Sequence, residues 1–152
     1  MDTLGRMGNN SWTIDTSRMP LVVTTFGRRL RDDADVREMI AKGDELFKSR
    51  SKLFHVIDLR QMVEPANAVQ RKIMADWHKQ VKATNANACI VATAIVVEST
   101  IVRGAMTAVL WLSSSSAERT EVFPNPETAI RWLHRVSQEM SLPFPSDAVT
   151  NV

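Results

Sequence analysis

The chain has one cysteine among its 152 residues. A lone cysteine cannot form an intrachain disulfide, so the sequence argues against the disulfide-stapled scaffolds of small secreted proteins. Cys89 lies in the middle of an apolar run. Nothing beside it in the sequence supplies the base or the cationic surroundings that a nucleophilic thiol needs. We therefore expect Cys89 to be a small buried hydrophobic residue.

Glycine is scarce, and neither sign of charge is in large excess. The five glycines are scattered, which leaves no glycine-rich phosphate loop. The 19 basic residues nearly balance the 17 acidic ones, and no basic stripe with interleaved aromatics is present. The composition therefore does not indicate a nucleic-acid-binding protein. His55, His78 and His134 lack the spacing of metal ligands, so we expect no metal site.

Long hydrophobic runs are also missing. No apolar run reaches the ~18 residues that a membrane-spanning helix requires, and the polar segment 1–12 has no signal-peptide core. We expect a cytoplasmic protein with no membrane span. The length fits one domain, which we place at residues 12–141. Residues 1–11 are expected to be flexible, and residues 142–152 are expected to form a loose tail.

The sequence does contain a regular alternation of two kinds of segment. Apolar β-branched runs, typical of strands, alternate with segments in which apolar residues recur at helical spacing. The expected strands are 12–16, 21–26, 53–59, 88–97 and 121–123, and the expected helices begin near residues 32, 65, 101 and 126. This β-β-α-β-α-β-α-β-α order predicts an α/β fold with a mostly parallel sheet of four or five strands.

The expected topology leads to a prediction about assembly. Right-handed crossovers between neighbouring strands would place the helices mainly on one face of the sheet. The other face would then need polar residues or a partner. The segment 101–112 is apolar around most of a helix circumference, which also indicates a second buried side. We therefore predict a two-fold homodimer.

Three stretches of the chain resemble the SpoIIAA-like STAS domains of bacteria, which include anti-sigma-factor antagonists and the cytoplasmic tails of sulfate transporters. Residues 55–60 resemble the central strand that ends in an Asp-Leu pair, 101–112 the third helix of uncharacterised members, and 122–133 the closing strand and helix. The resemblance covers roughly residues 21–133. It implies a non-enzymatic signalling or protein-interaction module, with a small-ligand carrier or sensor as the alternative.

The chain departs from that family at one functional position. Antagonist members carry a phosphorylatable serine at the start of the second helix. The matching stretch, 64–68, reads Glu-Pro-Ala-Asn-Ala and has no hydroxyl side chain. The resemblance therefore implies a module that lacks the serine phosphoswitch.

The candidate site consists of Asp58, Arg60, Arg71 and Arg103. Asp58 and Arg60 end a predicted parallel strand, where ligands of open α/β sheets tend to bind. Arg103 lies in the first turn of the predicted third helix, whose N-terminus attracts anions. These residues either bind a protein partner or a small anionic or lipid-like ligand, or they form structural ion pairs. No catalytic residue and no cofactor is predicted.

One apolar stripe at intervals of four on the predicted second helix is expected to face the core. Its members are Val69, Ile73, Trp77 and Val81. Trp77 is at its centre, and core packing is the expected role of its ring.

Overall fold

A computed structural model of the chain describes residues 3–6, 11–64, 66–98 and 119–150. It contains a six-stranded sheet in the order β1-β2-β3-β4-β5-β6. The strands are β1 (Thr3–Arg6), β2 (Trp12–Arg18), β3 (Leu21–Phe26), β4 (Leu53–Asp58), β5 (Ile90–Val96) and β6 (Arg119–Phe123). Strands β1 to β3 pair antiparallel, and β3 to β6 pair parallel. The predicted mostly parallel α/β fold is confirmed, with one strand more than expected.

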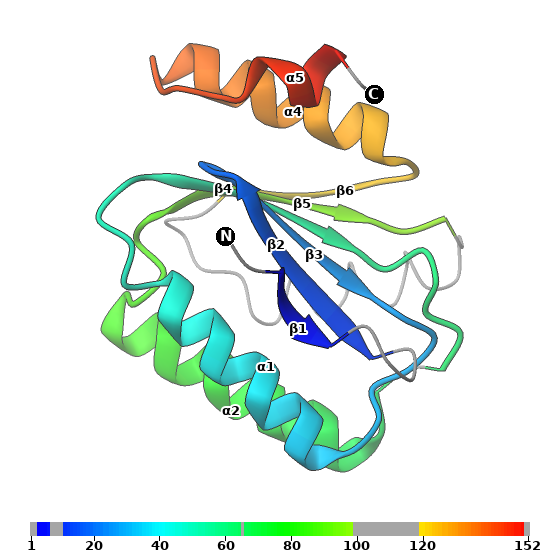
Figure 1. Cartoon of the computed structure of the whole chain (residues 1–152). Helices are drawn as coiled ribbons and strands as arrows, with labels where there is room; N and C mark the ends of the chain where they lie inside the picture. Colours follow the sequence, from blue (N-terminus) through cyan, green and yellow to red (C-terminus); the bar gives the residue numbers. More distant parts are fainter. Residues whose placement is uncertain (1–2, 7–10, 65, 99–118, 151–152) are drawn as a thin grey trace.

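The described helices cover both faces of this sheet (Figure 1). They are α1 (Asp33–Leu46), α2 (Ala68–Thr84), α4 (Pro126–Glu139) and α5 (Ser146–Thr150). Figure 1 shows α1 and α2 together on one face and α4 with α5 on the other. The expectation that the helices lie mainly on one face is therefore wrong for the C-terminal part of the chain. The predicted helix 101–112 lies outside the described residues.

The handedness of crossovers explains why the last helices differ from the first two. A strand–helix–strand unit is right-handed, and the successive strand order β3-β4-β5 therefore puts α1 and α2 on the same face. Among the described residues no strand follows α4, so this rule does not fix its face. Its apolar residues Ala129, Leu133 and Val136 are buried against the face of β4 and β5 that carries Phe54 and Ala92. The face that seemed to need a partner is thus covered within the chain.

Side-chain caps set the first residues of the long helices. Asp32 and Asn125 accept hydrogen bonds from the first turns of α1 and α4, at the positions expected from the sequence. Helix α2 begins at Ala68, three residues after the proline that was expected to open it. Asn67 and Gln70 form a reciprocal capping box, with N···O distances of 2.8 Å and 3.0 Å. This box satisfies two backbone N–H groups and makes Asn67 the cap.

Both ends of the chain contain regular structure that was not expected. Strand β1 lies within the segment expected to be flexible and pairs with β2, which is therefore not an edge strand. Helix α5 lies within the expected loose tail, where Ala148 is fully buried. Phe144 meets Phe54 edge-on, with 5.4 Å between the ring centres. The tail is therefore part of the hydrophobic core that packs on β4.

A buried carboxylate connects the start of α1 to β2. Asp35 is fully buried and accepts hydrogen bonds from the Ser11 hydroxyl, from Trp12 Nε1 at 3.0 Å and from the Arg31 backbone N–H at 3.2 Å. The Arg31 guanidinium lies 3.6 Å from the same carboxylate. Burying a charge is costly unless it is paired and hydrogen-bonded, and Asp35 meets both conditions.

Trp77 holds α1 against α2 and does not reach the sheet. Its ring is half-buried and stacks on Phe47, with 5.7 Å between ring centres and 10° between planes. Its indole N–H donates to Asp44 at 2.9 Å. A Cβ atom on Gly43 would lie 2.9 Å from the same ring, so the close approach of the two helices requires glycine there. Trp77 was expected to pack in the core beside the sheet, and its observed contacts instead join α1 to α2.

Candidate functional site: the carboxyl edge of the sheet

Asp58 and Arg60 lie at the carboxyl end of β4 and bind one another. Asp58 is the last residue of the strand, and Arg60 follows two residues later. Arg60 Nε donates to Asp58 Oδ1 at 3.0 Å, Arg60 Nη2 donates to Oδ2 at 2.8 Å, and the Arg60 backbone N–H also donates to Oδ1 at 3.0 Å. This is a bidentate pair, the strongest geometry for an arginine and a carboxylate.

The surroundings of Arg60 favour its charged form. The side-chain hydrogen bond to Asp58 raises the pKa of Arg60, partial burial opposes it, and the charges of Asp58 and Glu98 add to the increase. The Asp58 side chain is 13% exposed and that of Arg60 is 38% exposed. Of the two interpretations of these residues, the geometry favours a local ion pair. An anionic ligand would have to compete with Asp58 for the fork of Arg60.

The loop after β3 is joined to the loop after β4 by backbone hydrogen bonds. The Arg28 carbonyl accepts from Val63 N–H at 2.9 Å and from Glu64 N–H at 3.1 Å. Arg29 lies 3.8 Å from Glu64, and both side chains are well exposed. The two loops therefore form one continuous surface at this edge of the sheet.

Helix α2 continues that surface. The Arg71 guanidinium donates to the Ala66 carbonyl at 2.6 Å, which ties the first turn of α2 to the loop before it. Two large apolar side chains nearby are exposed to solvent, Val63 at 61% and Val69 at 55%. Val69 was expected in the core stripe, and that expectation is wrong. Of that stripe, Val81 is buried and Ile73 packs against the core cluster of α1.

We refer to this region as the carboxyl-edge surface. It consists of Arg28, Arg29, Arg60, Val63, Val69 and Arg71. Of the sequence-predicted site residues, Asp58 and Arg60 are brought into contact, Arg71 lies on the adjoining first turn of α2, and Arg103 lies outside the described residues. Sequence reasoning missed the arginine pair after Gly27 and both valines. The available signal was the pair Arg28–Arg29, which comes directly after Gly27 and the end of β3.

The most strongly shifted titratable group lies elsewhere. His55, in the middle of β4, bonds to the Thr24 hydroxyl, with 2.8 Å between Nε2 and Oγ1. Burial lowers the pKa of His55 to about 4, so the ring is neutral near neutral pH. This hydrogen bond joins β4 to the neighbouring strand β3, so the pair belongs to the sheet and not to the carboxyl-edge surface.

Two cavities lie away from the carboxyl-edge surface. One, of about 340 Å³, is lined by Arg119, Thr120, Glu121 and Trp132. The other, of about 470 Å³, lies at the amino ends of β3 and β4. The described residues contain no group of three or more His, Cys, Asp or Glu side chains arranged to hold a metal ion. None of the described helices has the length and apolar character to cross a bilayer.

The order of strands and helices defines a SpoIIAA-like α/β fold. The chain superposes on the crystal structure of an uncharacterized protein from the DUF3478 family with a SpoIIAA-like fold, from Shewanella loihica PV-4. The TM-score is 0.57 at 13% sequence identity, and the match covers 81% of this chain and 92% of that chain. No family model and no curated protein matches the sequence. The similarity establishes the fold, and the expected SpoIIAA-like architecture is confirmed.

Proposed function

We propose that the protein is a non-enzymatic, STAS-like interaction module that binds an acidic partner protein through the carboxyl-edge surface. The observation that carries this proposal is the exposure of Val63 and Val69 in a segment of the chain that also carries exposed arginines. Within the described residues, neither Arg28 nor Arg71 forms an ion pair with a carboxylate. Arginine surrounding exposed apolar side chains is typical of protein interfaces.

Hydrogen bonds within this surface support the proposal in addition to its composition. The Asp58–Arg60 fork, the bonds from Val63 and Glu64 to the Arg28 carbonyl and the capping box of α2 connect its described residues. A surface that is ordered before binding loses less conformational entropy when a partner docks. The excess positive charge favours a partner that presents acidic side chains.

The proposal includes the absence of a serine phosphoswitch in this surface. Residues 61–70, which contain the loop and the first turn of α2, include no serine or threonine. We propose that binding here is controlled by the availability of the partner and not by phosphorylation of the loop.

Site-specific photo-crosslinking in cells tests the proposal. A photoreactive residue is placed at Val69, and the matched control is placed at exposed Arg135 on α4, on the opposite face of the sheet. We expect a protein partner to be captured at Val69 and not at Arg135. The capture should be lost with V69D and with R71E, and it should persist with K79E, which changes an exposed lysine farther along α2.

The binding should also weaken as salt increases, because the arginines contribute through charge. Equal capture at both positions, or capture that survives V69D and R71E, would contradict the assignment of the surface. Recovery of a small anion instead of a protein would favour the ligand-carrier alternative.

A further inference from the structure

The larger cavity lies at the opposite edge of the sheet from the carboxyl-edge surface. It occupies about 470 Å³ and is formed where the turn between β2 and β3, the loop between α1 and β4 and the segment after α4 meet. Its lining residues are Met19, Pro20, Ser49, Ser51, Lys52, Leu53, Leu142 and Pro143. This volume is within the range of about 300–1,000 Å³ that small-molecule sites occupy.

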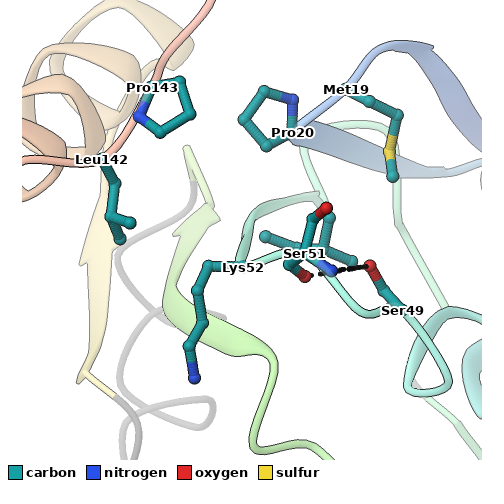
Figure 2. Close-up of a pocket in the computed structure, with 8 residues that line it drawn as sticks. Met19, Pro20, Ser49, Ser51, Lys52, Leu142 and Pro143 are labelled. Atoms are coloured by element: carbon teal, nitrogen blue, oxygen red, sulfur yellow. Dashed lines mark hydrogen bonds between the residues drawn. The ribbon is translucent and has the colours of Figure 1, made fainter.

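The walls of the cavity are mostly apolar. In Figure 2 the rings of Pro20 and Pro143 lie on opposite sides of the gap, with Leu142 below Pro143 and Met19 beside Pro20. Met19 is 46% exposed, so an apolar side chain at the margin of the site is open to solvent. An apolar group bound between the two prolines would cover part of this surface.

Lys52 is the one charged residue among those that line the cavity. Figure 2 shows the Lys52 side chain running away from both proline rings. Its ammonium donates to the Ala88 carbonyl at 3.3 Å and has no carboxylate partner among the described residues. An ammonium has three donors, so Lys52 retains capacity for a further acceptor.

Ser49 and Ser51 form hydrogen bonds that define the conformation of the loop before Lys52. The Ser49 hydroxyl donates to the Ser51 carbonyl at 2.9 Å and accepts from the Ser51 backbone N–H at 3.2 Å. The loop follows the C-terminus of α1, whose carbonyl dipoles repel anions. Lys52 is therefore the group that would make the site attractive to a negative charge.

We propose that this cavity binds a small amphipathic monocarboxylate. The carboxylate would bond to the Lys52 ammonium, and the apolar body would lie between Pro20 and Pro143. The proline rings supply apolar walls, and Lys52 supplies the single positive charge of the lining. This site does not depend on the proposed partner surface. An anionic or lipid-like ligand was expected near Asp58 and Arg60, and the proposed site lies instead at the amino edge of the sheet.

Titration of the full ¹⁵N-labelled chain with octanoate, followed by amide NMR, tests this site. We expect saturable shifts in the amides of residues 49–53 and Leu142, with smaller shifts at the carboxyl edge. Octanol, which has the same chain length without the charge, should bind more weakly. K52M, which keeps the aliphatic stem and removes the charge, should weaken octanoate binding by about tenfold.

K79M, which removes an exposed lysine on α2, is the matched control and should bind octanoate like the unaltered chain. M19S should weaken both octanoate and octanol, because it removes an apolar wall from an exposed position where folding is not at risk. Shifts that do not saturate at millimolar octanoate would overturn the proposal. Equal binding by K52M and K79M would overturn it as well.

Discussion

At the scale of single residues, two buried polar side chains determine how the stability of this protein responds to change. Asp35 is fully buried and His55 is partly buried, and the protein environment acts on the two side chains in opposite ways. Burial keeps His55 neutral, whereas four donors surround Asp35 as they would surround a carboxylate. Neither side chain is at the carboxyl-edge surface, and both act through folding.

For His55 we predict a stability that falls with acid. Its pKa is about 4 in the folded chain against 6.5 for an ordinary histidine, so between these values the unfolded chain binds a proton and the folded chain does not. Stability therefore rises with pH across that window and is lost as pH falls from 6.5 toward 4. The loss between pH 7 and pH 5 is about 2 kcal/mol.

Urea unfolding at a series of pH values measures this effect. H55Q retains a partner for the Thr24 hydroxyl and should remove the histidine contribution, which makes stability less dependent on pH over the same interval. An identical pH dependence for H55Q and the unaltered chain would show that His55 is accessible to protons in the folded state.

For Asp35 we predict that D35A costs about 3 kcal/mol or more in free energy of unfolding. The substitution leaves the Ser11 hydroxyl, the indole N–H of Trp12 and the Arg31 guanidinium without their shared partner. D33A is the matched control on the exposed side of the same helical turn and should cost only about 0.3–1 kcal/mol, through the helix dipole. Chemical denaturation of the two variants compares them directly, and equal losses would contradict the network.

At the scale of elements, the contact between α1 and α2 depends on a glycine opposite a tryptophan. We predict that G43A destabilises the unaltered chain by about 1–3 kcal/mol, because the new Cβ meets the Trp77 ring at 2.9 Å. In a W77L background the same substitution should stabilise by up to about 1 kcal/mol, because alanine favours the helix. Thermal or urea unfolding of the four variants in this cycle measures the reversal. A stabilising G43A in the unaltered chain would mean that the ring moves aside at no cost.

At the scale of the whole molecule, the assembly state is the main untested prediction. The covering of one sheet face by α4 and α5 removes one of the two arguments for a dimer. The other is the apolar composition of residues 101–112, which is a property of the sequence alone. On that basis we still predict a homodimer. Sedimentation equilibrium at micromolar concentration should give about twice 17.1 kDa, and the monomer mass at every concentration would contradict the prediction.

Most of the strands and helices could be predicted from the amino-acid sequence, because the signals that define them are local. The strand Leu21–Phe26 and the helix that begins at Pro126 were predicted at the residues where they occur. Apolar periodicity and capping chemistry depend only on neighbours in the chain. The pairing of Asp58 with Arg60 could be considered from the sequence for the same reason, since only Leu59 separates them.

Which segments pack against one another became known from the three-dimensional arrangement. The placement of α4 on the vacant face, the buried α5, and the exposure of Val69 depend on packing between segments far apart in the sequence. The cavity at the amino edge likewise combines Pro20, Lys52 and Pro143, which no local pattern relates. The right-handed crossover rule fixes the sheet face of a helix only when a parallel strand follows that helix. Whether a side chain is buried depends on which segment packs against it. These are relations in space, so the location of both proposed sites came from the fold.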